Sequence, residues 1–198
     1  MRVEIEQRSR EYDGFFKLER VQLVYQRFDG SMSHPVTRLV FERGDSAAVL
    51  LYDASAEKVI LVEQFRYPAY AREGGDGRLL EIVAGTVAPG STPEQVAYAE
   101  LVEEAGWELE SLEPIATFYP SPGACTERIF LYLGQLSAAT QVGDGGGRQG
   151  SGEDIRVHEV PLRAALEMIR SGEIRDAKTI IALQCLAARE ENGALAHT

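Results

Sequence analysis

The apolar positions of the chain form short runs bounded by glycine, proline or aspartate, and such runs predict β-strands. Strands are predicted, in chain order, at 18–28, 36–41, 47–53, 58–66, 79–84, 115–119, 129–133 and 154–161. The first two flank a turn at Asp29-Gly30, and helices follow the last strand at about 162–171 and 177–190. Because strands and helices do not alternate regularly, the pattern predicts an α+β fold.

One further helix is predicted from its end signals, between a glycine-bearing loop at 85–91 and Gly106. Thr92 is the expected N-cap, Pro93 occupies the first helical position, and Gln95 completes a capping box. Gly106 stands where a C-terminal cap belongs. The segment therefore predicts a short helix with well-defined ends.

Three glutamates, Glu100, Glu103 and Glu104, stand at positions i, i+3 and i+4 of this helix, so their side chains share one face. The opposite side carries apolar residues spaced four apart, namely Ala97, Leu101 and Ala105. An isolated cluster of this kind is usually a solvated acidic face. The alternative is a metal site, because a bound cation would reverse the repulsion between three close carboxylates.

The spacing of this segment resembles the signature of the Nudix hydrolases. The matching residues are Gly85, Glu100, Leu101, Glu103, Glu104, Gly106 and Trp107. Two positions depart from the signature, with Ser91 in place of its first glutamate and Ala99 in place of its arginine. In the family those two residues pair and brace the loop against the helix, so losing both removes a salt bridge without leaving a lone charge.

Segments at 14–34, 38–44, 61–70, 119–128, 152–160 and 172–184 resemble the ADP-ribose pyrophosphatase branch of the family. The resemblance covers the chain from about residue 14 to 187, and the branch includes hydrolases of other nucleoside diphosphate sugars. It implies a Nudix α/β/α sandwich at 46–198, preceded by an antiparallel β-subdomain at 1–45. It also implies that this subdomain is exchanged across a homodimer, with active sites completed by both subunits. A lone N-terminal hairpin is at best marginally stable, which also favours a partner surface.

The resemblance implies a metal site for magnesium, with manganese as the alternative. Magnesium is a hard ion that prefers oxygen ligands. The expected ligands are the carbonyl of Ala84 and the carboxylates of Glu100, Glu103, Glu104 and Glu153.

The position expected to activate water departs from the family pattern. The branch usually carries a glutamate two residues before Glu153, and here that position is Ser151, which cannot act as a base near neutral pH. The catalytic group is therefore assigned to Glu153 or Glu127 together with the metal ligand Glu104, or the water is activated mainly by metal.

The resemblance also implies substrate-binding residues. Arg66 matches an arginine placed near the diphosphate, while Arg38 and Phe16 match positions that line the terminal sugar or the base. A tight turn is predicted at 121–123, where the backbone of Gly123 would approach the substrate, with Glu127 at the rim. For each of these the plain alternative is a packing or surface residue.

Residues 143–152 hold six glycines in ten positions. This composition is typical of a flexible connector, and the alternative is a mobile lid that brings Glu153 and Asp154 to the site.

Composition excludes some functions. The formal net charge of −11 argues against a nucleic-acid or anionic-membrane surface, although a small anionic substrate can bind through metal and local arginines. Cys125 and Cys185 have no metal-binding spacing and are expected to be reduced thiols. No signal-peptide or membrane-spanning run is apparent, so a cytoplasmic location is expected.

The sequence therefore predicts a magnesium-dependent hydrolase that cleaves the diphosphate linkage of ADP-ribose or a related nucleoside diphosphate sugar, such as GDP-mannose. A catalytically attenuated protein that binds or senses nucleotide sugars is the alternative, given Ser91, Ala99 and Ser151.

Overall fold

The structure is a computed structural model that describes residues 1–148, 150, 152–191 and 193. Its contacts divide the chain into two compact units. The first unit comprises Met1–Asp45 and Tyr119–Arg128, and the second comprises Ser46–Phe118 and Ile129–Thr198. The first unit thus includes a loop, residues 119–128, that lies far along the chain.

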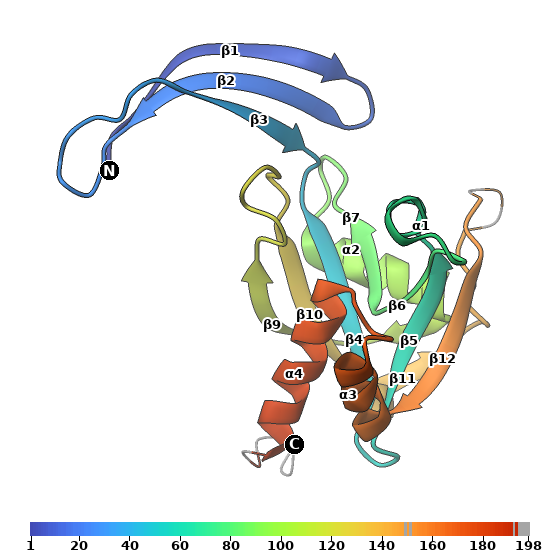
Figure 1. Cartoon of the computed structure of the whole chain (residues 1–198). Coiled ribbons are helices and arrows are strands. Elements are labelled where there is room, and N and C mark those ends of the chain that lie inside the picture. The colour runs from blue at the N-terminus through green and yellow to red at the C-terminus, as the bar shows by residue number, and fades with distance from the viewer. Residues whose placement is uncertain (149, 151, 192, 194–198) are drawn as a thin grey trace. The chain divides into compact units, whose positions relative to one another are not determined.

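The first unit is built on an antiparallel sheet of three strands, β1 (Val3–Asp13), β2 (Lys17–Tyr25) and β3 (Val36–Glu42), with β2 in the centre (Figure 1). The strands predicted at 18–28 and 36–41 are confirmed as β2 and β3. Strand β1 is not predicted from the sequence. Its side chains are largely charged and exposed, so it lacks the apolar alternation that identifies a half-buried strand.

The loop at 119–128 belongs to the first unit through main-chain hydrogen bonds to β3. The Phe41 N–H donates to the Ala124 carbonyl at 2.7 Å, and the Thr126 N–H donates to the Phe41 carbonyl at 3.1 Å. The tight turn predicted in this loop is present, since the Ala124 and Cys125 N–H groups both donate to the Ser121 carbonyl.

The second unit contains the remaining strands and helices. In chain order they are β4 (Ser46–Asp53), β5 (Lys58–Phe65), α1 (Tyr67–Glu73), β6 (Arg78–Glu81), β7 (Val83–Thr86), α2 (Pro93–Glu100), the π-helical turn η1 (Leu101–Ala105), β8 (Trp107–Leu109), β9 (Glu113–Phe118), β10 (Ile129–Gln135), the 3₁₀ turn η2 (Leu136–Ala138), β11 (Ala139–Gln141), β12 (Ile155–Pro161), α3 (Leu162–Ser171) and α4 (Ala177–Glu191).

The second unit is a sheet covered by helices on both faces (Figure 1). The strand order is β12-β5-β4-β10-β9, with β6 paired to β5 and β7 paired to β4, and β4 runs parallel to β10. Alternate residues of β4 point to opposite faces. Leu50 and Tyr52 pack in the cluster that includes α3 and α4, whereas Val49 and Leu51 pack in the cluster that includes α2. Covering both faces explains why β4 is apolar without alternation.

The predicted α+β fold with an α/β/α sandwich is confirmed. Most of the longer elements lie where the sequence predicts them, namely the strands β4, β5, β9, β10 and β12 and the helices α3 and α4. The sequence does not predict α1, β8 or β11. Each is short, and none has the apolar repeat of a longer element. Among the described residues, no helix is long and apolar enough to cross a membrane.

Candidate active site

The helix that carries the three glutamates begins and ends as its sequence predicts. The Thr92 hydroxyl accepts from the Gln95 N–H at 3.2 Å, and the Gln95 side chain accepts from the Thr92 N–H at 2.9 Å. Gly106 ends the helix in the left-handed conformation, with φ at 76°. The sequence does not predict that α2 continues into the π-helical turn η1. We call α2 and η1 together the signature helix; π turns of this kind occur often at functional sites.

The inner face of the signature helix packs on the sheet. Ala97, Leu101 and Ala105 are buried, as predicted. Glu104 is buried beside them, with 5% of its surface exposed. Its carboxylate accepts a hydrogen bond of 3.1 Å from the main-chain N–H of Ala84 on β7. This contact brings Ala84 and Glu104 together, while a ligand role for the Ala84 carbonyl stays a prediction.

Glycine at position 85 makes room for Glu100. A β-carbon on Gly85 would lie 1.9 Å from Oε1 of Glu100 and 2.3 Å from its carboxylate carbon. The carboxylate of Glu100 thus lies directly against the backbone of β7, and a side chain at position 85 would have to displace it. The pairing of Gly85 with Glu100, fifteen residues apart in the sequence, keeps Glu100 in this place.

Two carboxylates of the signature helix, Glu100 and Glu104, hold protons more tightly than ordinary glutamates. Burial raises the pKa of Glu104 to about 7, against the hydrogen bond from Ala84, and the charge of Glu100 adds to this rise. Burial also raises the pKa of Glu100 to about 7, with contributions from the charges of Glu103 and Glu153. A cation among these groups would lower both pKa values, because it stabilises the ionised forms.

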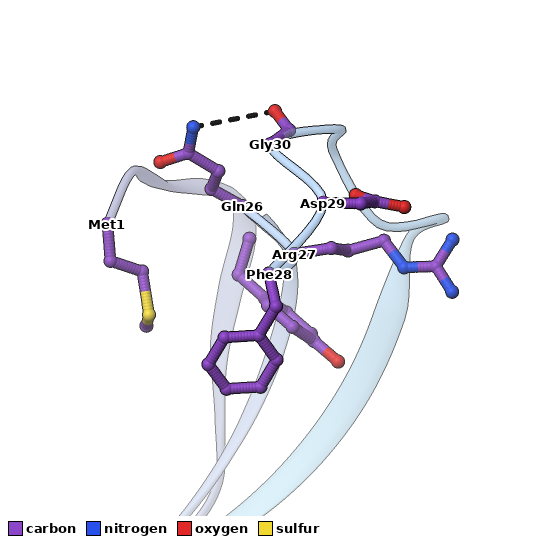
Figure 2. Close-up of a pocket in the computed structure, with 7 residues that line it drawn as sticks. Met1, Gln26, Arg27, Phe28, Asp29 and Gly30 are labelled. Carbon is purple, nitrogen blue, oxygen red and sulfur yellow. Dashed lines mark hydrogen bonds between the residues drawn. The ribbon is translucent and has the colours of Figure 1, made fainter.

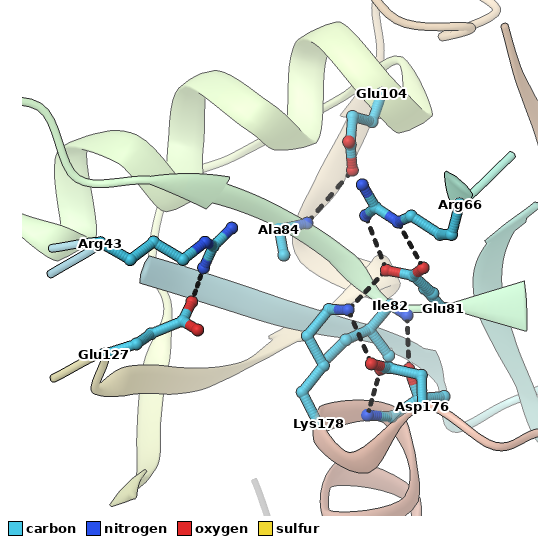
Figure 3. A network of polar contacts seen from close by, with 10 residues as sticks. Arg43, Arg66, Glu81, Ile82, Ala84, Glu104, Glu127, Asp176 and Lys178 are labelled. Carbon is cyan, nitrogen blue, oxygen red and sulfur yellow. Dashed lines mark hydrogen bonds and ion pairs between the residues drawn. The ribbon is translucent and has the colours of Figure 1, made fainter. Parts of the chain in front are cut away.

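Arg66 stands beside this cluster and is held by a second buried carboxylate, Glu81. The Nε and Nη2 atoms of Arg66 donate to the two oxygens of Glu81 at 2.7 and 2.8 Å. Figure 3 shows Arg66 between Glu81 and Glu104. The Nη1 atom of Arg66 makes no hydrogen bond to the described residues, so this edge of the guanidinium can donate to a ligand.

Glu81 is also tied to the start of α4 (Figure 3). Lys178 donates to Glu81 at 2.5 Å and lies 3.1 Å from Asp176, whose carboxylate accepts from the N–H and hydroxyl of Thr179. The Thr179 hydroxyl in turn accepts from the Ile82 N–H at 2.8 Å. Burial opposes ionisation of Glu81, yet Arg66 and Lys178 outweigh it and lower its pKa to about 2.

Sequence reasoning missed Glu81, Asp176 and Lys178. Two signals were available: a glutamate between apolar residues in the strand at 79–84, and an aspartate followed two residues later by lysine at the start of the last helix. Neither signal shows that the two segments meet, since they are almost a hundred residues apart.

Glu153 lies near the carbonyl end of the signature helix. Its Oε2 accepts from the Arg148 N–H at 3.0 Å, and its charge contributes to the raised pKa of Glu100. Ser151, which replaces the glutamate of the related branch, lies outside the described residues. Within the described residues, no three acidic, histidine or cysteine side chains converge as a preformed metal-binding group. The ligand roles of Glu100, Glu103, Glu104 and Glu153 therefore stay predictions.

The other predicted site residues lie in the first unit. Glu127 forms an ion pair with Arg43, and the Arg43 guanidinium lies over the ring of Phe16, 5.7 Å from its centroid. Phe16 also makes an edge contact with Phe41, at 5.3 Å between centroids. Arg43 thus brings Phe16 and Glu127 into one group, and it was not predicted.

Arg38 and Gly123 do not share that group in the described contacts. Arg38 is exposed on β3 and donates to the Thr37 carbonyl at 3.2 Å. Gly123 is exposed in the loop, and a β-carbon there would meet nothing within 4 Å. Their substrate-binding roles stay predictions.

Comparison with known proteins identifies the family. The family model described as the NUDIX domain matches residues 42–182. This chain belongs to the Nudix hydrolase family. The resemblance drawn from Gly85, Glu100, Glu103 and Glu104 is thereby confirmed.

Two named relatives of this Nudix chain cover most of its length. It is 40% identical to the ADP-ribose pyrophosphatase of Escherichia coli K12 over 184 residues, 93% of this chain and 87% of that one. It is 37% identical to the GDP-mannose pyrophosphatase of Cronobacter sakazakii over 177 residues, 89% of this chain and 91% of that one. A crystal structure titled ADP compounds hydrolase matches with a TM-score of 0.73 at 16% identity and covers 98% of each chain, which supports the fold.

The first unit of this Nudix chain has a hollow of about 740 Å³. It is lined by Met1 and residues 25–30, at the turn after β2 (Figure 2). Met1 and Phe28 are almost fully exposed there, and none of the predicted site residues takes part. The hollow therefore adds nothing to the candidate site.

The raised pKa of Glu104 predicts how stability depends on pH in the absence of divalent metal. The pKa rises from 4.5 to about 7 on folding, so between these values the folded state keeps a proton that the unfolded chain has released. Stability should therefore fall as pH rises from about 5 to about 8. Glu104→Gln should remove part of this slope and raise the free energy of unfolding at about pH 8 by up to roughly 3 kcal/mol.

Urea unfolding with chelator present, at several pH values, measures this effect. Glu108→Gln is the matched control, since Glu108 is an exposed carboxylate on β8, and it should leave the slope unchanged. Equal slopes of stability against pH for the wild type and Glu104→Gln would contradict the assignment of Glu104 as a buried carboxylate with a raised pKa.

Proposed function

We propose that this chain hydrolyses the diphosphate linkage of ADP-ribose or a related nucleoside diphosphate sugar, giving a nucleoside monophosphate and a sugar phosphate. The observation that carries the proposal is the crowding of Glu100 and Glu104, both with a pKa raised to about 7, beside an arginine with a free hydrogen-bonding edge. The relatives named ADP-ribose pyrophosphatase and GDP-mannose pyrophosphatase support this substrate class.

The donor set fits a divalent cation. Carboxylate oxygens are the ligands that magnesium prefers, and manganese accepts the same set. Gly85 leaves the space in which the Glu100 carboxylate lies, and Glu104 is buried without a cationic hydrogen-bond partner among the described residues. We propose Glu100, Glu103, Glu104, Glu153 and the Ala84 carbonyl as ligands of magnesium or manganese. When bound, the ion would neutralise phosphoryl charge and lower the pKa of water.

Arg66 is proposed to bind the diphosphate. Its Nε and Nη2 atoms are held by Glu81, which Lys178 also contacts, so the guanidinium is fixed before substrate binds. A fixed donor beside a phosphoryl oxygen needs no reorganisation during the reaction. Glu81 and Lys178 are thus positioning residues, acting through Arg66.

The remaining substrate contacts are assigned by resemblance. Phe16 and Arg38 are proposed to line the base or terminal sugar, and the Gly123 backbone and Glu127 to lie at the rim. Stacking of an aromatic ring on a nucleobase is a reasonable use of Phe16, which already carries a guanidinium at one face. A cytoplasmic location, and the absence of nucleic-acid and membrane partners, stay expectations from the sequence.

Turnover should require divalent metal. We expect product release from ADP-ribose with magnesium or manganese, and none with chelator. Glu103→Gln should reduce turnover by more than about 10-fold, because even partners one shell beyond a metal ligand usually cost this much. Folding should be unaffected, since Glu103 is exposed.

A phosphatase-coupled assay on a panel that includes ADP-ribose and GDP-mannose measures turnover and the preferred sugar. Glu108→Gln is again the control. Binding of these sugars without turnover under any metal would favour the attenuated sensor instead of an enzyme.

Variants of Glu153 and Glu127 distinguish the general base from a positioning residue. The ion pair between Glu127 and Arg43 favours a positioning role for Glu127, so we assign the base to Glu153. Glu153→Gln should then lower the rate by roughly 10²–10⁴-fold, the usual contribution of a positioned base, while Glu127→Gln should mainly raise KM. Steady-state rates on ADP-ribose for both variants measure this. A large loss of kcat only in Glu127→Gln would show that the base is Glu127.

We also propose that the chain is a homodimer joined through its N-terminal unit. A three-stranded sheet has few ways to cover its apolar side chains, and this one exposes Val3, Ile5, Tyr12, Phe15, Phe28, Leu39 and Phe41. Exposed apolar groups of this extent usually mark an interface. Sedimentation equilibrium at micromolar concentration should give twice the chain mass of 21.8 kDa. A single species at the chain mass would rule the dimer out.

A further inference from the structure

The carbonyl end of the signature helix is covered by the chain that follows β11. The last carbonyls of a helix lack partners within it and must find them elsewhere. The Val142 N–H donates to the Gly106 carbonyl at 2.8 Å, the Gly146 N–H to the Glu104 carbonyl at 3.0 Å, and the Gly147 N–H to the Glu103 carbonyl at 3.0 Å. Two of these carbonyls belong to proposed metal ligands.

The covering segment must be glycine for two reasons. Gly145, Gly146 and Gly147 have φ values of +69°, +104° and +87°, which other residues rarely adopt. The approach to the helix is also very close, since a β-carbon on Gly145 would lie 2.3 Å from the Glu104 carbonyl oxygen. From the other side, a β-carbon on Gly106 would lie 2.2 Å from the Gly143 carbonyl oxygen.

Gly147 also contacts Glu153. A β-carbon on Gly147 would lie 2.8 Å from Cβ of Glu153 and 3.2 Å from its Oε2. The next residue, Arg148, donates its N–H to that same oxygen at 3.0 Å. The chain then returns to the segment, where the Ile155 N–H donates to the Gly146 carbonyl at 3.3 Å. One glycine thus separates the backbone of Glu103 from the side chain of Glu153.

We propose that residues 145–147, which we call the glycine latch, position Glu153 against the carbonyl end of the signature helix and so set its place relative to Glu100, Glu103 and Glu104. The role of the glycine latch in catalysis rests on the proposed function. Residues 145–147 have the composition of a flexible connector, yet they act as a fixed part of the site, and Gly147 is the positioning residue whose replacement moves Glu153.

Replacing Gly147 by alanine tests the latch, with Gly150→Ala as the matched control. Both positions have positive φ, +87° and +82°, so alanine strains the backbone alike at each. Only at position 147 would the added β-carbon clash with other atoms, those of Glu153, because nothing lies within 4 Å of a β-carbon at Gly150. Metal-free full-length protein is titrated with Mn²⁺ and the bound ion is measured by electron paramagnetic resonance.

Gly147→Ala should weaken Mn²⁺ binding by about 10- to 100-fold, the usual effect of disturbing a group that orients a ligand, and Gly150→Ala by far less. The effect should be small when Glu153→Gln is already present, because the displaced carboxylate is then no longer a charged ligand. Equal Mn²⁺ affinities for Gly147→Ala and Gly150→Ala would overturn the latch, as would a full loss that persists in the Glu153→Gln background.

Amide hydrogen exchange on the unmodified, metal-free protein tests the same contacts if Gly147→Ala does not fold. The Gly146 and Gly147 amides should exchange more slowly than the Gly150 amide, because their N–H groups are bound to helix carbonyls. Exchange as fast as that of Gly150 would overturn the latch. A wild type that binds no Mn²⁺ but protects these two amides would instead contradict the proposed metal site while supporting the latch.

Discussion

Glu104 is a carboxylate buried under the signature helix, and its only hydrogen bond within the described side-chain contacts comes from the Ala84 main chain. A buried carboxylate without a cationic partner costs several kcal/mol, which appears here as a pKa near 7. The charges of Glu100 and Glu81 add to this cost, while the Ala84 N–H and the charge of Arg66 offset only part of it. A cation bound as proposed above would offset this cost by stabilising the ionised carboxylates.

The neighbouring Glu81 shows how the same chain treats a carboxylate that it does pair. Glu81 is even more buried than Glu104, yet Arg66 and Lys178 lower its pKa to about 2. The two carboxylates sit on either side of Arg66 with opposite shifts. Glu81 is ionised at neutral pH and holds the guanidinium of Arg66 in place, whereas Glu104 can carry a proton near neutral pH. Groups pushed apart in pKa within one site are typical of catalytic centres.

The parts of the site that depend on neighbours in the sequence could be predicted from it. The capping box at Thr92 and Gln95, the left-handed Gly106 and the burial of Ala97, Leu101 and Ala105 follow from local rules and are confirmed. The reason for Gly85 could not be predicted, because it depends on where a carboxylate fifteen residues later comes to lie. Nor could the contact of Lys178 with Glu81, or of Gly147 with Glu103, since chain topology alone brings those segments together.

The π-helical turn escapes prediction for a different reason. Its sequence, LVEEA, has ordinary helix formers and would suit an α-helix, so only its tertiary contacts favour the wider turn.

The departures at Ser91 and Ala99 can be understood from how the signature helix is held. Both residues are exposed, and among the described residues no buried side-chain polar atom lacks a partner, so their replacement leaves no stranded charge. The start of the helix is fixed by its capping box, and its end by hydrogen bonds from Gly146 and Gly147. The capping box and the glycine-rich segment thus hold the two ends of the signature helix in a chain that has no charged pair at positions 91 and 99.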